Sequence, residues 1–246
     1  MIHFFKQNKP ILKDLIPDNF VDIHSHLLPG IDDGATSIED TKNLILGLET
    51  IGIKKFITTP HVMSDVWKNT KVNILNKKEE TLAQLEIPSI KNRFKVAAEY
   101  MLDAEFRELI KTERLLTLKD NYVLVEMSYL NPPIQLYDIL SELRVAGYQP
   151  VLAHPERYRF FQNSLSDYKK LKTAGCYFQL NMLSATGYYG QKIAKVTDEL
   201  LENGFIDFIG SDVHHTRHVE VFYKKIVLKN HAFLPSIFQN NALFNF

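Results

Sequence analysis

The stretch VDIHSHLLPGIDDGA, residues 21–35, places His24 and His26 two positions apart, and Asp32 and Asp33 follow shortly afterwards. On an extended strand, residues i and i+2 point to the same side, so both imidazoles could bind one metal ion. A single pair at this spacing is weak evidence in a chain with nine histidines. The other ionisable residues therefore decide between a metal site and a chance pair.

Ionisable side chains recur at the ends of the apolar segments that are typical of β-strands. In chain order these are His61 in TTPHVMSD, Glu99 in AAEY, Glu126 in LVEMS, His154 with Arg157 in LAHPERY, and Asp212, His214 and His215 in SDVHH. In parallel α/β sheets and barrels, catalytic residues come from the carboxyl ends of strands. We therefore expect these residues to meet at one rim rather than to serve separate structural roles.

Imidazole and carboxylate ligands together suit first-row divalent ions such as Zn, Mn or Fe. A cluster of such ions binds phosphate oxygens and lowers the pKa of a bound water from about 15.7 to near 7. The pattern predicts metal-assisted hydrolysis of a phosphoester.

The elements that must position these residues alternate between β and α patterns. Strands are expected at 20–24, 54–59, 94–99, 122–127, 149–153, 176–181 and 205–210. A capping box at Thr36 and Glu39 would begin a helix that stops at Gly52, and further helices are expected at 71–85, 103–111, 134–146, 165–174, 190–203 and 217–228. This alternation implies an α/β fold with a parallel sheet. Seven units without a break in composition favour a closed or nearly closed barrel, and a doubly wound open sheet is the alternative.

Bulk properties restrict the class of protein. The 246 residues suit one domain spanning 1–246, with an N-terminal extension at 1–19 and a docked tail at 229–246. The 29 basic and 29 acidic side chains balance, which argues against a nucleic-acid partner. No apolar run approaches the ~18 residues that span a bilayer, and the N-terminus lacks the pattern of a signal peptide. With Cys176 as the one cysteine, these features lead us to expect a cytoplasmic protein.

The motifs DIHSHLLPGIDDG, TPH, AEY, LAHPERY and SDVH, in this order, resemble the polymerase-and-histidinol-phosphatase (PHP) superfamily. Within it, the chain is most similar to the bacterial manganese-dependent protein-tyrosine phosphatases of capsule and exopolysaccharide operons. The resemblance covers roughly residues 20–220. It implies a distorted (β/α)7 barrel of the PHP type. It also implies three divalent metal ions at the C-terminal rim of the strands, with Mn²⁺ first and Fe or Zn as alternatives.

The resemblance also assigns residues to the site. The implied metal ligands are His24, His26, Asp33, His61, Glu99, Glu126, His154, Asp212 and His214. Glu99 would bridge two ions, and Asp32 would orient the loop. Arg157 matches the family's phosphate-binding arginine, and Arg217 is the nearest match to a second one, although HHTRHVE departs from the family pattern. His215, Asp65 or a water would protonate the leaving group.

Two further positions keep alternative interpretations. Asp22 either fixes the imidazole of His24 or stays at the strand end without a metal contact. The polar groups of QLNMLSATG, residues 179–187, either line the site or satisfy loop backbone.

By the same resemblance, the substrate is a phosphotyrosine protein, namely an autophosphorylated bacterial tyrosine kinase that drives polysaccharide export. Histidinol-phosphate hydrolysis is the alternative within the fold, followed by a 3′-exonuclease and by a non-catalytic regulator that keeps the metals. A thiol-based tyrosine phosphatase is excluded because Met182, not an arginine, follows Cys176 by six positions. No P-loop motif is present.

Overall fold

The computed structural model describes residues 9–162 and 164–246, so residues 1–8 of the expected N-terminal extension lie outside the described part. All paired strands run parallel. One sheet has the order β1-β2-β4 and the other β3-β5-β6-β7-β8-β9. The strands are β1 (Val21–Asp22), β2 (Lys55–Thr58), β3 (His61–Val62), β4 (Phe94–Val96), β5 (Glu99–Met101), β6 (Tyr122–Glu126), β7 (Gln149–Ala153), β8 (Tyr177–Asn181) and β9 (Phe208–Gly210).

The two sheets belong to one closed ring. Between β4 and β5, hydrogen bonding continues across the break, because Ala97 N donates to Thr58 O at 2.8 Å and Glu99 N to Pro60 O at 3.1 Å. On the other side, Asp212 N donates to His24 O at 2.7 Å, which joins the chain after β9 to the chain after β1. With β2–β3 and β4–β5 taken as two kinked strands, seven strands close the barrel. The expected distorted (β/α)7 barrel is confirmed.

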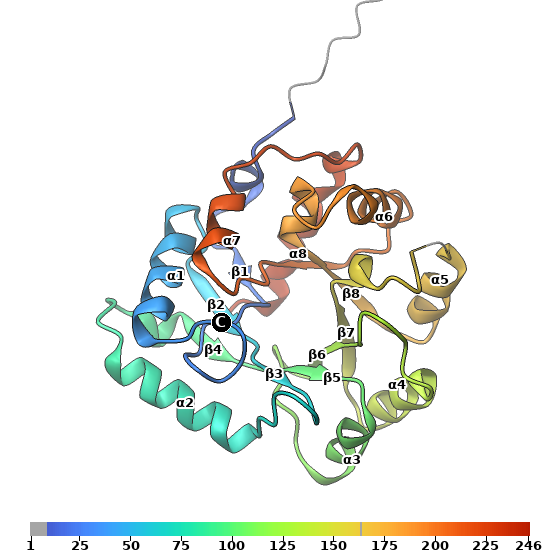
Figure 1. Ribbon diagram of the computed structural model, residues 1–246, viewed down its shortest axis with the longest axis horizontal. Coiled ribbons are helices and arrows are strands. Elements are labelled where there is room, and N and C mark those ends of the chain that lie inside the picture. Colours follow the sequence, from blue (N-terminus) through green and yellow to red (C-terminus); the bar gives the residue numbers. More distant parts are fainter. Residues whose placement is uncertain (1–8, 163) are drawn as a thin grey trace, which may run out of the picture.

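Helices surround this ring on its outside (Figure 1). They are α1 (Ile38–Thr50), α2 (Lys71–Gln84), α3 (Ala104–Thr112), α4 (Leu136–Val145), α5 (Leu165–Thr173), α6 (Gln191–Glu202), α7 (Thr216–Val221) and α8 (Leu234–Asn240). Short 3-10 turns include η1 (Leu12–Leu15), η3 (Pro155–Arg157), η4 (Met182–Thr186) and η6 (Asn241–Phe244). Within the described ranges, no helix is both long and apolar enough to span a bilayer.

Three sequence-based predictions of local structure were wrong. The strand expected at 94–99 is split in two, and β3 was not predicted at all. The cap of α1 is Ser37, whose side chain accepts from Asp40 N, rather than Thr36 paired with Glu39. The helix expected at 217–228 ends at Val221, because the following backbone bonds to the N-terminal segment: Leu12 N donates to Lys224 O at 3.0 Å.

Buried apolar side chains form two clusters that separate the inside of the barrel from its helical coat. The smaller cluster includes Val151, Ala153 and Leu124 from neighbouring strands. Phe244 of η6 joins it and packs on Tyr122, the first residue of β6, with ring centroids 5.5 Å apart. The C-terminal segment therefore covers the barrel at the amino ends of the strands, opposite to the rim.

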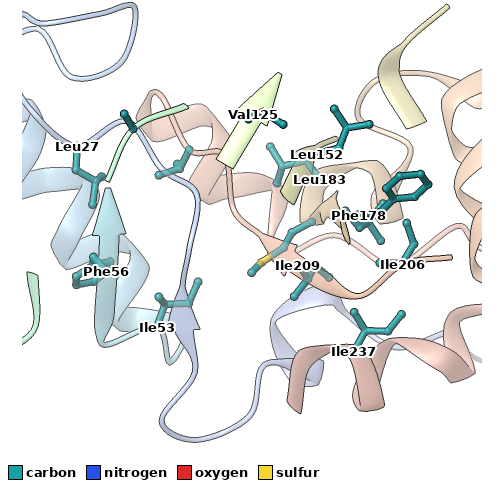
Figure 2. Close-up of a cluster of buried hydrophobic side chains, with 14 of the residues drawn as sticks. Leu27, Ile53, Phe56, Val125, Leu152, Phe178, Leu183, Ile206, Ile209 and Ile237 are labelled. Atoms are coloured by element: carbon teal, nitrogen blue, oxygen red, sulfur yellow. The ribbon is translucent and has the colours of Figure 1, made fainter. Parts of the chain in front are cut away.

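The larger cluster lies between strands and helices, where Ile237 of α8 packs beneath Ile209 of β9 (Figure 2). Because the central strands are buried on both faces of the sheet, their sequences are nearly continuous runs of apolar residues.

Candidate metal centre

All nine residues expected as metal ligands meet at the carboxyl ends of the strands. Their ligand atoms form four overlapping groups, and within each group the atoms lie within 4.8 Å of one another. The groups are His24–Glu99–His154, His24–His26–Asp212, His61–Glu99–Glu126 and His26–Asp33–His61–His214. Because several residues belong to two groups, the geometry suits neighbouring ions that share ligands.

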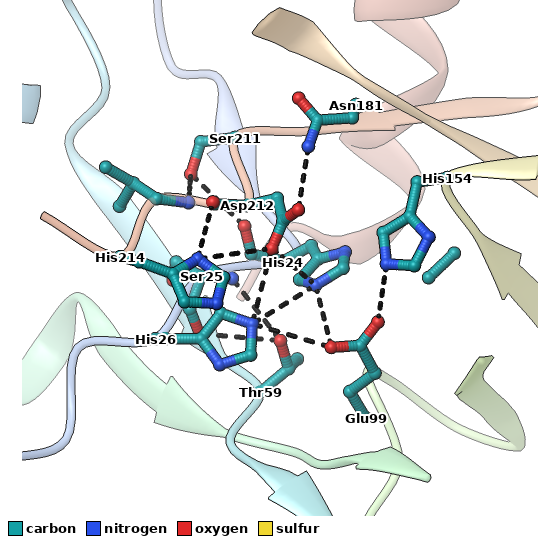
Figure 3. Close-up of polar contacts among 12 residues, drawn as sticks. His24, Ser25, His26, Thr59, Glu99, His154, Asn181, Ser211, Asp212 and His214 are labelled. Atoms are coloured by element: carbon teal, nitrogen blue, oxygen red, sulfur yellow. Dashed lines mark hydrogen bonds and ion pairs between the residues drawn. The ribbon is translucent and has the colours of Figure 1, made fainter. Parts of the chain in front are cut away.

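The pair His24 and His26 shows why these groups suit a cation. The Nδ1 atom of His24 lies 2.7 Å from Gln179 Oε1, and Nδ1 of His26 lies 2.8 Å from Asp32 Oδ2. Both partners are acceptors, so each Nδ1 carries the proton and each Nε2 keeps a lone pair in the neutral ring. The two Nε2 atoms face each other at 3.3 Å (Figure 3). Two lone pairs at this distance repel unless a proton or a metal ion lies beside them.

Glu99 lies at the centre of the cluster and is fully buried. Its Oε2 lies 3.1 Å from His24 Nε2 and 3.2 Å from His61 Nδ1, while its Oε1 lies 3.0 Å from His154 Nε2. Burial opposes its charge, but His24 and His61 outweigh burial and hold its pKa well below the usual range. Each oxygen faces a different set of imidazoles, which is the geometry of a bridging carboxylate.

His61 and Glu126 form a second buried pair, with His61 Nδ1 at 2.7 Å from Glu126 Oε1. Burial, and then the charge of Glu99, raises the pKa of Glu126 to about 7. For His61, burial lowers the pKa, but Glu126 and Glu99 raise it to about 11. The carboxylates therefore favour positive charge at this position, whether a proton or a metal ion supplies it.

Asp212 and His154 both adopt left-handed backbone conformations, with φ of 50° and 36°. Such conformations cost of order 1–3 kcal/mol in non-glycine residues and are found at functional sites. Asp212 Oδ2 accepts from Arg157 Nη1 at 2.8 Å and from Asn181 Nδ2 at 2.7 Å. Its Oδ1 is buried and has no hydrogen-bond partner within the described residues, and it lies 3.2 Å from His24 Nε2. Asp212 Oδ1 and His24 Nε2 can therefore both donate a lone pair to the same metal ion.

Two aspartates support the centre from outside these groups. Asp32 accepts from Gly34 N at 2.9 Å as well as from His26, so it orients both the loop and the imidazole. Asp22 accepts from Ser211 N at 2.9 Å and does not contact the ring of His24. The structure places Asp22 at the strand end, bonded to Ser211, and it is the amide oxygen of Gln179 that contacts the ring of His24.

Arg157 extends into the site from η3. Its guanidinium lies between the rings of Tyr129 and Tyr189, with centroid distances of 4.7 and 4.4 Å. The rings and Asp212 raise its pKa against the effect of burial, so it stays charged. Arg157 thus combines a fixed position with a permanent charge, as phosphate binding requires.

A cavity of about 310 Å³ opens beside these groups and is lined by Asp33, Arg157, Tyr188, Tyr189, Asp212, His214, His215 and His218. His215 therefore faces the same space as Arg157. Arg217 lies exposed in the first turn of α7 and does not line this cavity. Tyr129 and His218 were missed by sequence reasoning. Tyr129 follows Glu126 by three positions, and this proximity to a strand end was the available signal.

Comparison with known proteins places this geometry in a family. Residues 20–224 match the protein-family profile described as "Capsular polysaccharide synthesis, CpsB/CapC". The tyrosine-protein phosphatase YwqE of Bacillus subtilis is 29% identical over 198 residues, which cover 80% of this chain and 78% of YwqE. The tyrosine-protein phosphatase CpsB of Streptococcus pneumoniae is 28% identical over 203 residues, covering 79% of this chain and 83% of CpsB.

A solved structure shares the fold. It belongs to a study of YwqE from Bacillus subtilis and CpsB from Streptococcus pneumoniae, described as "unique metal-dependent tyrosine phosphatases". It superposes with a TM-score of 0.77 at 26% identity and covers 91% of this chain and 93% of its own. The chain belongs to the CpsB/CapC family of capsular polysaccharide synthesis.

Proposed function

We propose that this chain is a metal-dependent protein-tyrosine phosphatase that acts in the synthesis of capsule or exopolysaccharide. The observation that carries the proposal is the convergence of nine ligand-type side chains, in four overlapping groups, beside the charged Arg157. The relatives named as tyrosine-protein phosphatases support the choice of substrate.

We further propose that the cluster holds three divalent ions, with Mn²⁺ as the native metal. The ligands would be His24, His26, Asp33, His61, Glu99, Glu126, His154, Asp212 and His214. Glu99 suits the bridging position because its two oxygens face different imidazoles. When bound, the ions supply a Lewis acid for the phosphate and a water of lowered pKa.

The chain's own residues then position the substrate and its leaving group. Arg157 would donate its planar fork to the phosphate oxygens, and the rings of Tyr129 and Tyr189 hold the guanidinium in place. His215 would donate a proton to the departing phenolate, whose pKa near 10 makes the help required modest. We retain Arg217 as a second candidate for phosphate binding, reached by a side-chain movement from its exposed position on α7.

The partner we propose is a phosphotyrosine protein, namely an autophosphorylated bacterial tyrosine kinase of the polysaccharide export system. The family description supports the link to capsule synthesis. Because such a kinase uses ATP, we place the reaction in the cytoplasm.

The test is hydrolysis by metal-stripped protein after Mn²⁺, Fe²⁺ or Zn²⁺ is added back. We expect metal-dependent release of phosphate from a phosphotyrosine peptide, fastest with Mn²⁺, and little from histidinol phosphate. A matched control is the metal-stripped protein with Mg²⁺, which prefers oxygen ligands and should not replace ions held by imidazoles. Release from histidinol phosphate alone would overturn the proposed substrate.

A further inference from the structure

Two adjoining hollows form a groove that starts beside the metal centre. The first, of about 590 Å³, is lined by apolar groups that include Val62, Phe106 and Leu109. The second, of about 490 Å³, shares Met63, Ser64 and Asp103 with the first. We call the two hollows together the rim groove.

Several lining residues of the rim groove follow candidate metal ligands closely in the chain. Val62, which lines the first hollow, directly follows His61 in β3. Ser128, which lines the second hollow, follows Glu126 by two residues. Adjacent residues of an extended peptide lie about 3.3–3.6 Å apart. A peptide that ran along this side of the rim while its phosphotyrosine reached the cluster would place its neighbouring residues at the groove.

The walls of the rim groove are held in place by their own hydrogen bonds. Asp103 caps α3 by accepting from Phe106 N at 2.8 Å, and its other oxygen accepts from Ser64 N at 3.2 Å. Asn69 Nδ2 donates to His61 O at 2.8 Å, which ties the loop after β3 back to the site. Figure 1 shows this loop and α3 on the same side of the barrel. A groove formed in advance lowers the cost of ordering a bound peptide.

The charges around the rim groove are mostly negative. Asp65, Asp103, Glu105 and Glu108 line it, and Lys68 is the one basic side chain among its described lining residues. Glu108 forms an exposed ion pair with Lys111 at 2.7 Å, which offsets part of its charge. Glu105 forms no ion pair with any other residue that the structure describes, so its charge is available to a partner.

We propose that the rim groove binds the peptide segment that flanks the phosphotyrosine, and that it prefers segments carrying lysine or arginine. This inference rests on the proposed phosphatase function and names the sequence preference of the same site. The apolar floor would take the aliphatic stems of the basic residues, while Glu105 and its acidic neighbours face their charged ends.

The test compares two phosphotyrosine peptides of equal length, one with lysines and one with glutamates around the phosphotyrosine. The variant is the double substitution Glu105→Lys with Glu108→Lys. Its matched control is Glu199→Lys with Glu202→Lys on α6, where the spacing is the same and Glu199 also faces a lysine, Lys195. An aryl phosphate without a peptide reports on the metal centre alone.

We expect wild-type protein at low salt to have a kcat/KM about fivefold higher for the lysine peptide, the range of one or two exposed charge interactions. The preference should shrink with added salt because these charges are exposed. It should vanish or reverse in the groove variant and persist in the α6 control. Hydrolysis of the aryl phosphate should stay the same in all three proteins.

Equal rates on both peptides in wild-type protein would overturn the proposal, as would an equal loss in the α6 control. A change of elution volume in the groove variant alone would instead assign the groove to contact between copies of the chain. If the aryl phosphate is not hydrolysed at all, the proposed function fails. Fluorescence anisotropy with the two labelled peptides then still decides the preference of the groove, because it measures binding without turnover.

Discussion

Asp32 offers the sharpest test of how the centre is built, because it contacts the candidate ligands without being one of them. Its Oδ2 accepts from His26 Nδ1 at 2.8 Å and from His61 N at 3.3 Å, and its Oδ1 accepts from Gly34 N at 2.9 Å. Both oxygens therefore face donors only. The substitution Asp32→Asn keeps the shape but replaces one acceptor by an amide that donates.

Either orientation of the new amide leaves a conflict. If the amide nitrogen faces Gly34 N, two donors meet, and the unsatisfied group costs about 1–3 kcal/mol. If it faces His26, the ring must accept at Nδ1 and move its proton to Nε2, the atom that faces His24 and Asp212. That proton competes with a metal ion. Changes of this kind cost 10–100-fold in metal affinity, which is about 1.4–2.8 kcal/mol.

The assay is calorimetric titration of metal-stripped protein with Mn²⁺. Asp120→Asn is the matched control, because it removes the same charge at an exposed position with φ of 49°, which asparagine tolerates. We expect Asp32→Asn to weaken binding at least tenfold and Asp120→Asn to leave it unchanged. Wild-type affinity in a folded Asp32→Asn protein would refute the idea that this carboxylate sets the tautomer of His26.

Three further predictions concern the scaffold. Asn241→Ala should lower the free energy of unfolding by about 3 kcal/mol in urea titrations, because the buried Asn241 donates to Val21 O and Ile209 O inside the barrel end. Asn240→Ala, which removes a single exposed hydrogen bond to Asp207 O, should lower it by no more than about 1 kcal/mol. Gly34→Ala should destabilise the protein by about 1–3 kcal/mol, since the new methyl group would overlap the backbone oxygen and Cβ of His26; an unchanged melting temperature would contradict this packing. Burial raises the pKa of Cys176, which lies just before β8, to about 12. Iodoacetamide at pH 8 should therefore alkylate it at least about a hundredfold more slowly in native protein than in urea, and equal rates would show that the thiol is accessible in the folded protein.

The periodic parts of the fold could be predicted from the sequence because each depends on local spacing. The helix expected at 165–174 matches α5 at Leu165–Thr173, and the strand expected at 149–153 matches β7. The failures share a different cause. The end of α7 depends on backbone bonds from Leu12, more than two hundred positions away, and local periodicity carries no information about such a contact.

The candidate metal ligands could be predicted from the sequence, whereas the residues that support them could not. Ligand-type residues at strand ends are marked by their chemistry, and a parallel barrel brings strand ends together. Tyr129 has no such chemical mark, because a tyrosine can pack in the core or stack on a charged group, and its place three positions after Glu126 does not distinguish the two. Its role depends on the position of Arg157 across the cavity, 4.7 Å from the ring. Only the three-dimensional arrangement reveals that contact.

The metal centre combines strained backbone with buried charge at the carboxyl ends of the strands. His154 directly follows β7 and Asp212 lies two positions beyond the end of β9. Both have left-handed backbone conformations, while their amides still donate to the neighbouring segments, at Gln179 O and His24 O. Their side chains reach the centre of the cluster, with His154 Nε2 at 3.0 Å from Glu99 Oε1 and Asp212 Oδ1 at 3.2 Å from His24 Nε2. Backbone strain and buried like charges both oppose folding, whereas bound cations offset them. The barrel interior below, filled by Val151, Leu124 and Phe244, supplies the stability that this arrangement requires.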